Sequence, residues 1–130
     1  MDGRNIEESE LVIKNYTSHD IHIIKLDDHV WQEGRKWVAD SGVSVARTVL
    51  KGKVLNADFE MLESDIDGIK VIDKRVISID EIPEDCDVAI VSAMYAAASN
   101  DERIFTIMNK VFSEDGRILG CLAIGRLLRD

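Results

Sequence analysis

Residues 88–99 read VAIVSAMYAAAS, and this stretch does most to define the fold. Its first four residues are apolar without a break, which is typical of a short strand buried at the centre of a sheet. Ser92 follows and is suited to cap a helix, because its hydroxyl can accept a bond from a free backbone N–H. The alanine-rich residues 93–98 favour a helix. The sequence therefore predicts a buried strand that leads directly into a short helix.

Apolar runs upstream of this centre predict strands separated by polar turns. Residues 11–13 and 21–26 have strand-like composition, and residues 16–20 between them are polar and suited to a turn. We expect these two strands to form an N-terminal hairpin. Residues 44–56 resemble one long β segment with a bend or bulge at Gly52.

A second turn is predicted at Asp67-Gly68, a dipeptide that favours tight hairpin turns. Residues 69–72 and 76–79 are expected to be two short strands after it. The preceding residues 57–63 fit either a strand or a helical turn, because two of their apolar residues are spaced i, i+3.

The C-terminal third is predicted to contain a second helix and a final strand. The apolar residues between 104 and 112 fit one helical face better than strict alternation. They are Ile104, Phe105, Met108, Val111 and Phe112. A turn at 114–117 would then lead into a strand over residues 118–128.

These elements predict an α+β fold, a mostly antiparallel β-sheet that forms a partly closed barrel or a sandwich, with one or two short helices. The chain has 130 residues, a length typical of one domain with a substantial core. Residues 1–9 are polar and are expected to be a flexible N-terminal arm. Residues 10–130 would form the single β-rich domain.

Composition restricts the partners. The formal net charge is −9, and such an acidic protein would repel phosphate backbones, so direct nucleic-acid binding is not expected. The charge serves either solubility or binding to a basic protein surface, for which the acidic segments 58–67 and 80–87 would be suited. Neither a signal-like segment nor a long apolar run is present, so no membrane association is expected and a cytoplasmic location follows. Cys86 and Cys121 fit no metal or redox motif, and their disulfide state is left open.

Six polar residues at strand ends and turns are candidates for ligand binding, and no catalytic residue, metal ligand or cofactor is expected. The candidates are Asn15, Thr17, His19, Arg47, Ser92 and Arg117. His19 would either help Asn15 and Thr17 to lock a turn or face a ligand. Ser92 lacks the Gly-x-Ser-x-Gly pattern of a nucleophile elbow. The arginines would form an anion site only if they converged.

Two tryptophans and the three histidines allow further alternatives. Trp31 and Trp37 would form a hydrophobic cap over the sheet or stack on a ligand. His19, His22 and His29 lie near several aspartates, yet a turn followed by a strand would not place the first two on one face, so a metal site is disfavoured.

Five short motifs resemble a family of small uncharacterised proteins found mostly in bacteriophages and prophages. They are Asn15-Tyr16-Thr17-Ser18-His19, the Ser41-Gly42 segment ending in Ala46-Arg47, Asp67-Gly68-Ile69-Lys70-Val71, Ala89-Ile90-Val91-Ser92 and Asp115-Gly116-Arg117-Ile118-Leu119-Gly120. The family pattern has proline at the positions of Ser18 and Lys70, and tyrosine at that of Ala89. In that family, a loop or strand is usual where this chain has residues 103–112.

The resemblance implies a phage accessory protein that acts in the cytoplasm of a bacterial host. We expect a binding protein without enzymatic activity that antagonises host defence. It would bind a host protein or sequester a small nucleotide-like signal, either as a single chain or as a homo-oligomer. The alternatives are a small hydrolase that uses His19 with a nearby aspartate, and a structural virion or assembly protein.

Overall fold

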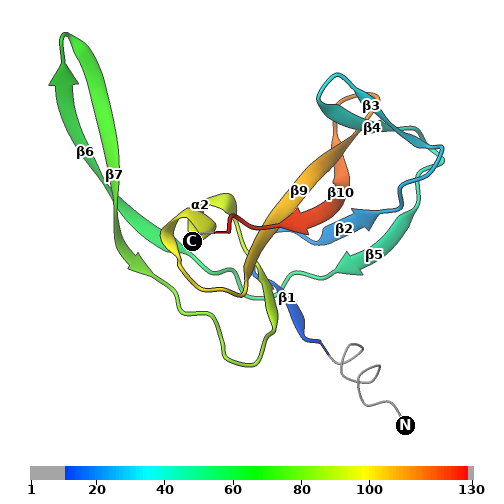
Figure 1. The fold of residues 1–130 in the computed structure, drawn as a ribbon, viewed down its shortest axis with the longest axis horizontal. Helices are drawn as coiled ribbons and strands as arrows, with labels where there is room; N and C mark the ends of the chain where they lie inside the picture. The colour runs from blue at the N-terminus through cyan, green and yellow to red at the C-terminus, as the bar shows by residue number, and fades with distance from the viewer. Residues whose placement is uncertain (1–10, 129–130) are drawn as a thin grey trace.

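The computed structural model describes residues 11–128, so the N-terminal arm predicted at residues 1–9 lies outside the described residues. Ten strands and one helix follow one another along this part of the chain (Figure 1). In order they are β1 (Ile13–Asn15), β2 (Ile21–Ile24), β3 (Val30–Glu33), β4 (Lys36–Ala39), β5 (Val45–Val49), β6 (Ala57–Ile66), β7 (Ile69–Ile79), β8 (Val88–Ile90), α2 (Ala93–Ala98), β9 (Ile104–Ser113) and β10 (Ile118–Gly125).

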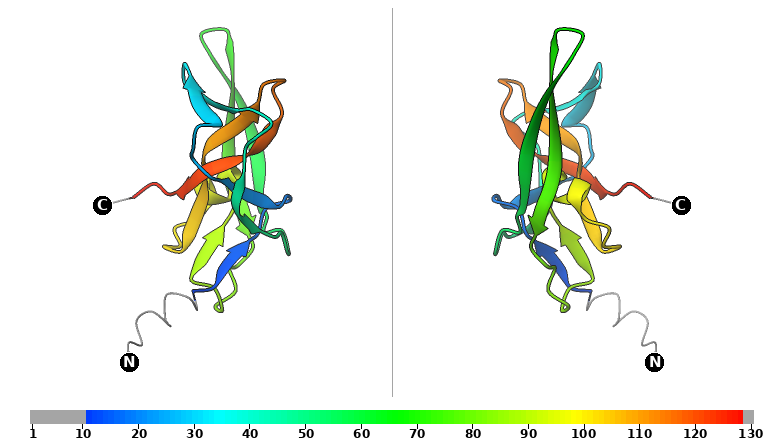
Figure 2. Two further views of the ribbon diagram at one scale, coloured as in Figure 1. Left: turned by 90° about the vertical axis from the view of Figure 1, so that its right-hand side faces the viewer. Right: turned by 90° about the vertical axis from the view of Figure 1, so that its left-hand side faces the viewer.

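The strands form a barrel-like sheet and a separate two-stranded hairpin, β6–β7. In the side views of Figure 2 the tip of this hairpin extends beyond the barrel. The sheet runs in the order β1-β8-β9-β10-β2-β5, and the β3–β4 hairpin joins it through β4 and β9. A single bridge between Asn15 and Lys51 links the two ends of this order and brings the sheet close to full closure. The predicted fold class, a mostly β α+β fold with a partly closed barrel, is confirmed.

Antiparallel pairing dominates by length, and shorter parallel ladders join the pieces. The long antiparallel ladders are β6–β7, β9–β10, β2–β5 and β3–β4. Parallel ladders connect β1 with β8, β8 with β9, β4 with β9, and β2 with β10. A sheet built in this way places residues far apart in sequence side by side.

The central strand and helix lie where residues 88–99 predicted them. Ala89, Ile90 and Val91 are almost fully buried, and Ser92 Oγ accepts a bond from Tyr95 N at 3.1 Å as the N-cap of α2. Tyr95 is the only buried residue of this short helix. It packs with Tyr16, Leu55, Ile82 and Cys86 in the cluster that anchors α2.

The predicted N-terminal hairpin is wrong. Strand β1 pairs with β8 in parallel, whereas β2 pairs with β5 and β10. Residues 16–20 do form a turn, but this turn carries the chain from β1, at one end of the strand order, to β2, which lies between β10 and β5. A local turn signal specifies a change of direction and does not specify which strand becomes the neighbour.

The predicted second helix at 104–112 is also wrong, because these residues form β9. This strand pairs with β8 in its first half, with β4 in its second half, and with β10 along its length. Asn109, with a φ of 55°, lies where the neighbour changes from β8 to β4. Ile104, Ile107 and Val111 pack in three different core clusters, and the rings of Phe105 and Phe112 are covered by Arg126 and Lys36. The apolar residues of β9 therefore do not alternate strictly, and their spacing mimics a helical period.

The predictions for residues 44–79 are correct only in part. Residues 44–56 do not form one strand, since β5 ends at Val49 and the following chain runs past β1. Residues 57–66 form strand β6, so the helical alternative there is wrong. The predicted turn at Asp67-Gly68 is confirmed, with φ of 53° and 83°. The two short strands expected after it are one strand, β7.

Candidate functional site

The motif Asn15-Tyr16-Thr17-Ser18-His19 forms a clasp where the barrel closes. The Asn15 amide nitrogen donates to the backbone carbonyls of His19 at 2.7 Å and Val49 at 3.0 Å. Its carbonyl oxygen accepts from Thr17 N at 2.9 Å and lies 2.6 Å from Thr17 Oγ1. Asn15 is buried, so every side-chain donor and acceptor of this residue is used within the protein.

The backbone around Asn15 extends the clasp. Gly52 N donates to the Asn15 carbonyl at 3.1 Å, and Lys51 N donates to Asp20 Oδ1 at 2.8 Å. The turn thereby fastens the end of β1 to the segment that follows β5. Asn15 and Thr17 thus have a structural role in this geometry, as the turn-locking interpretation of the motif expects.

Two of the candidate residues, His19 and Arg47, have side chains without a hydrogen-bond or ion-pair partner in the described part of the chain. Both residues are exposed, and among the described residues no hydrogen bond or ion pair involves the His19 ring or the Arg47 guanidinium. Asp20, the nearest carboxylate in sequence, is bonded to the backbone of Lys51. His19 therefore has no hydrogen-bonded carboxylate to act with as a general base.

Ser92 and Arg117 occupy separate places. Ser92 caps α2 and lies two residues beyond Ile90, the register partner of Asn15. Arg117 follows the turn of the β9–β10 hairpin, where its Nε lies 3.3 Å from Asp115. The structure therefore brings Asn15, Thr17 and the His19 backbone together, and it does not bring Arg47, Ser92 and Arg117 into one hydrogen-bonded group with them.

A cleft of about 420 Å³ lies beside the β9–β10 turn, between that hairpin and the β3–β4 hairpin. Trp31 and Phe112 contribute aromatic surface, and Lys36 Nζ lies 4.8 Å from the centre of the Phe112 ring. Glu33 accepts a bond from the Trp31 indole at 2.8 Å. The sequence indicated Trp31 as a possible stacking residue, but it gave no signal that Phe112 would lie in the same cleft.

A histidine–carboxylate pair exists at a position that sequence reasoning missed. His29 Nδ1 lies 2.8 Å from Asp40 Oδ1, and Gly42 N donates to the same oxygen at 2.8 Å. The bond from Gly42, more than the one from His29, holds the pKa of Asp40 below its usual value. A Cβ at Gly42 would lie 2.4 Å from the His29 ring. The Ser41-Gly42 motif thus gives His29 room to pack on the turn.

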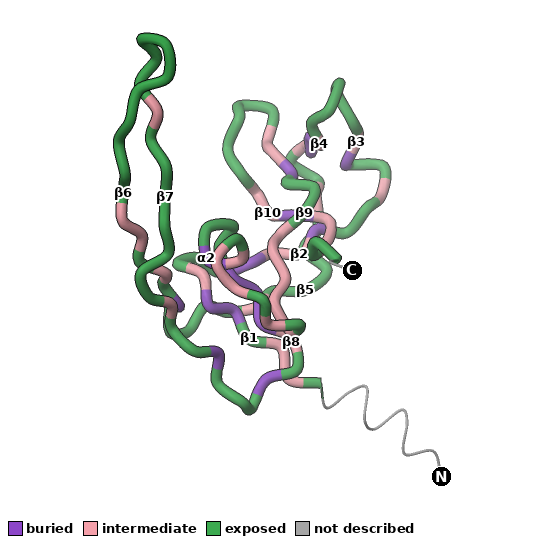
Figure 3. Tube along the Cα trace, turned by 60° about the vertical axis from the view of Figure 1, so that its left-hand side comes forward, coloured by how far each residue is buried: buried purple, intermediate pink, exposed green. Residues whose placement is uncertain are grey.

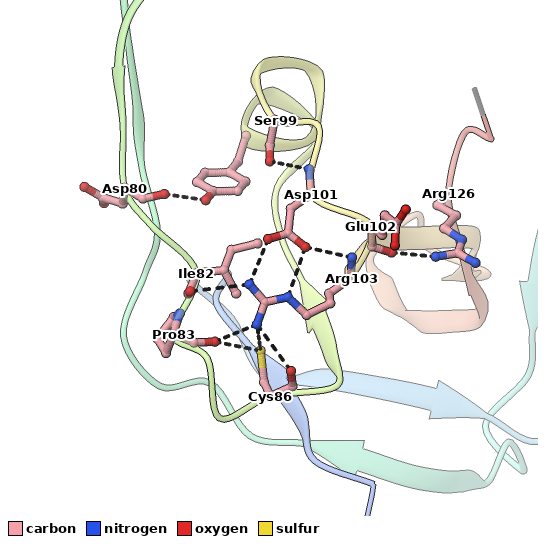
Figure 4. A network of polar contacts seen from close by, with 10 residues as sticks. Asp80, Ile82, Pro83, Cys86, Ser99, Asp101, Glu102, Arg103 and Arg126 are labelled. Atoms are coloured by element: carbon pink, nitrogen blue, oxygen red, sulfur yellow. Dashed lines mark hydrogen bonds and ion pairs between the residues drawn. The ribbon is translucent and has the colours of Figure 1, made fainter. Parts of the chain in front are cut away.

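Arg103 fastens the acidic loop between β7 and β8 to the chain after α2 (Figure 4). Its guanidinium donates to Asp101 at 2.8 Å and to the Pro83 carbonyl at 2.9 Å. The ion pair lowers the pKa of Asp101. Nearby, the Tyr95 hydroxyl donates to the Asp80 carbonyl. A cleft of about 380 Å³ runs between this loop and α2, and three of its lining side chains, those of Tyr95, Asp101 and Arg103, are engaged in holding the loop.

The β6–β7 hairpin projects from the barrel and is its most unusual feature (Figure 1). We call residues Ala57–Ile79 the hairpin arm. Its strands are hydrogen-bonded only to each other within residues 11–128. Apart from its base, nearly all of it is exposed (Figure 3). The exposed large apolar side chains are Met61, Leu62, Ile66, Ile69, Ile72, Val76 and Ile77.

The register shows how these apolar side chains are divided between the two faces of the arm. Residues directly opposite each other in a two-stranded sheet share a face, and faces alternate along each strand. One face carries the pairs Phe59–Val76, Met61–Lys74, Glu63–Ile72 and Asp65–Lys70. The other carries Glu60–Arg75, Leu62–Asp73, Ser64–Val71 and Ile66–Ile69. Neither face is purely polar, so the arm has no face that is obviously suited to water.

The sequence predicted residues 58–67 of the arm as an acidic surface for a basic protein target, and it predicted the strands and turn of the arm in part. It did not predict the exposed apolar side chains. One signal was available in the sequence. When residues 57–79 are paired around the Asp67-Gly68 turn, their apolar residues fall on both faces of the hairpin. An isolated hairpin is at best marginally stable in water, and an apolar surface of this kind marks an interaction site. The arm is therefore the leading candidate functional site.

The described part of the chain contains neither a cluster of metal-binding side chains nor a membrane-spanning helix. Within residues 11–128, no group of three or more His, Cys, Asp and Glu side chains is placed to hold a metal ion. The described segment also lacks any helix with the length and apolar character of a membrane span. Cys86 and Cys121, whose pairing the sequence left open, are buried free thiols. Comparisons with protein-family models, curated proteins and solved structures found no match.

Proposed function

We propose that this protein is a non-enzymatic binding protein that acts by protein contact through its hairpin arm. The observation that carries the proposal is the exposure of large apolar side chains along a hairpin that has no neighbouring strand within residues 11–128. Ile66 and Ile69 at its tip are 63% and 68% exposed. Burying one such side chain is worth about 1.5–3 kcal/mol, so a protein surface that covers the arm would gain substantially.

The arm also offers two free strand edges. Each edge carries backbone N–H and C=O groups that can pair with another chain, a common mode of peptide and protein recognition. Strand β6 contains Asp58, Glu60, Glu63 and Asp65 and no basic residue. A basic surface on the partner would therefore suit this edge, in agreement with the net charge of −9.

The resemblance to phage proteins supports a cellular setting for this activity, namely the interior of an infected bacterium. In that setting the protein is an accessory protein that acts in the bacterial cytoplasm and antagonises host defence by binding a protein target. The acidic loop between β7 and β8 offers a second surface for a basic host protein, because Arg103 and Tyr95 hold it in one conformation.

An enzymatic role has less support. A hydrolase using His19 would need a second polar group within hydrogen-bond reach, and the His19 ring has none among the described residues. Burial, followed by the neighbouring Cys86, raises the pKa of Tyr16 to about 12, so that this hydroxyl stays protonated at neutral pH. The side chains of Asp101 and Arg103, whose pKa values are also shifted, form an ion pair with each other.

A second candidate function is the sequestration of a small nucleotide-like signal. The observation that favours it is the cleft of about 420 Å³ with Trp31, Phe112 and Lys36, which combines aromatic surface with a cation. Titration of the protein with adenine nucleotides, followed by tryptophan fluorescence, would test it. Binding that Trp31→Ala abolishes is expected for this function, and an unchanged signal would count against it.

A photo-crosslinking experiment tests the proposed function. A photoreactive amino acid replaces Ile69 on the arm or, as a control, Leu50, which is 71% exposed on the barrel. The full-length protein is irradiated alone and in extract of a bacterial host. We expect defined protein adducts from position 69 that exceed those from position 50. Equal or absent adducts at both positions would overturn the proposal.

A further inference from the structure

The two strands of the hairpin arm carry opposite charge. Strand β6 has four acidic residues and no basic one, as given above. Strand β7 has Lys70, Lys74 and Arg75 against a single acidic residue, Asp73. The arm thus has one acidic edge and one net basic edge. A basic surface of the kind that suits β6 is present on this chain itself.

Part of this charge is already paired within the arm. Glu63 lies 2.7 Å from Lys70, and Glu60 pairs with Arg75. Lys74 has no partner among the described residues, so it remains available to an acidic neighbour. Like charges directly opposite each other on adjacent strands are unfavourable and opposite charges are favourable. The acidic edge of one arm therefore fits beside the basic edge of another, and each edge is unsuited to its own copy.

The distribution of apolar residues on the arm also favours contact between arms of different copies. Phe59, Met61, Ile72 and Val76 lie on one face, nearer the base, whereas Leu62, Ile66, Ile69 and Val71 lie on the other, towards the tip. Pairing of arms edge to edge around a common axis extends the sheet and turns one face of every arm towards the axis. There the apolar side chains of that face, Ile66 and Ile69 at the tip among them, pack against those of the other copies.

We propose that the partner of the hairpin arm is a second copy of this chain, with β6 of one arm beside β7 of the next. The inference rests on the proposed function, because it names the protein that the arm binds. The contact joins two different edges, so it is heterologous. We place the copies around a common axis, where such contacts close into a ring of three or more copies rather than a two-fold dimer. The acidic loop between β7 and β8 stays free for a host target.

Native mass spectrometry of the purified full-length protein tests the self-association. We expect masses of three or more times the 14.6 kDa chain. The double variant Ile66→Thr/Ile69→Thr keeps β-branched residues that favour a strand but removes apolar surface at the tip, and it should shift the mass to that of a monomer. Ile118→Thr, at a position 59% exposed on the barrel, is the matched control and should leave the assembly unchanged. Circular dichroism verifies that all variants are folded.

A charge variant tests the arrangement of the strands. Lys74→Glu would place acidic residues on both neighbouring edges, and it should weaken the association by about tenfold, which corresponds to about 1.4 kcal/mol. Lys53→Glu makes the same charge change outside the arm and should have little effect. Equal effects of the two substitutions would overturn the β6–β7 arrangement, and so would a wild-type dimer.

The remaining outcomes separate this inference from the proposed function. A wild-type monomer at all concentrations, or an assembly that survives the Ile66→Thr/Ile69→Thr substitutions, would overturn self-association through the arm. If the photoreactive residue at position 69 then captured another protein from host extract, the proposed function would stand with a different partner. If it captured nothing, both would fail.

Discussion

At the scale of single residues, the buried side chain of Asn15 determines how the barrel closes. Its amide donates to two backbone carbonyls, that of His19 in the turn after β1 and that of Val49 at the end of β5. Few other side chains can donate twice and accept at the same time. The motif that suggested a ligand site is therefore explained by the geometry of the closure.

Replacing Asn15 tests this explanation. Asn15→Asp keeps the shape of the side chain, but a carboxylate cannot donate and would face two carbonyls in a buried place. We expect a loss of about 3 kcal/mol in the free energy of unfolding at neutral pH, measured by urea denaturation. Thr17→Val removes a hydroxyl that lies within hydrogen-bond distance of Asn15 Oδ1 and the His19 carbonyl, and it should cost about 1 kcal/mol. Equal stability of Asn15→Asp and the wild type would contradict the clasp.

The ion pair between Asp101 and Arg103 gives a dependence of stability on pH. The bond from Arg103 lowers the pKa of Asp101 below its ordinary value of 3.8. A lowered folded-state pKa contributes stability above the unfolded-state pKa, and this contribution is lost as the pH falls through the folded-state pKa.

The variant Asp101→Asn should therefore be less stable than the wild type from neutral pH down to about pH 5, and the difference should shrink below that. Thermal unfolding across this pH series measures it. Asp28→Asn, at an exposed carboxylate, is the control and should show no such convergence. A difference that stays constant through pH 3 would show that the pair does not act through its charge.

At the scale of elements, the success of the sequence predictions depends on whether the signal is local. Ser92 and the alanines after it specify α2, and Asp67-Gly68 specifies the turn of the arm, because both signals involve neighbours in sequence. Strand β9 was missed because its apolar pattern reflects contacts with strands from distant parts of the chain. The N-terminal hairpin failed for the same reason, since β1 finds its partner in β8.

The candidate site shows the same division. Sequence reasoning identified Asn15, Thr17 and His19 as a group and correctly allowed for a turn-locking role. It could not predict that the two strands beside Asp67-Gly68 would leave the barrel, because projection from the barrel depends on the absence of a neighbouring strand. Predicting the contact of His29 with Asp40 would have required knowing that the pairing of β3 with β4 places these two residues side by side.

Close packing between β10 and β2 gives a prediction at this scale. A Cβ at Gly120 would lie 2.2 Å from the backbone carbonyl of His22, so Gly120→Ala must push the two strands apart. We expect a loss of about 2 kcal/mol in the free energy of unfolding. At Gly52 nothing lies within 4 Å of such a Cβ. Gly52→Ala should therefore be neutral or stabilise by about 0.5 kcal/mol, and equal effects of the two substitutions would contradict this packing.

At the scale of the whole molecule, the barrel and the hairpin arm are separable. The three buried core clusters lie in the barrel and under α2, and only Ala57 and Ile79 at the base of the arm pack against one of them. These two residues are register partners, so a two-residue Asn-Gly turn can join them in place of residues 58–78.

The shortened protein should fold, because it keeps the core, and it should be a monomer. Circular dichroism and native mass spectrometry measure both properties. Failure of the shortened chain to fold, with the wild type folded under the same conditions, would show that the arm supports the barrel instead of serving as a binding element.

The most direct measurement of the central claim is amide hydrogen exchange of the full-length protein over a series of dilutions. If the arm binds another copy, the amides of β6 and β7 exchange slowly at high concentration and faster on dilution, whereas those of β9 do not change. Arm amides that exchange at the same rate at every concentration would contradict self-association through the arm.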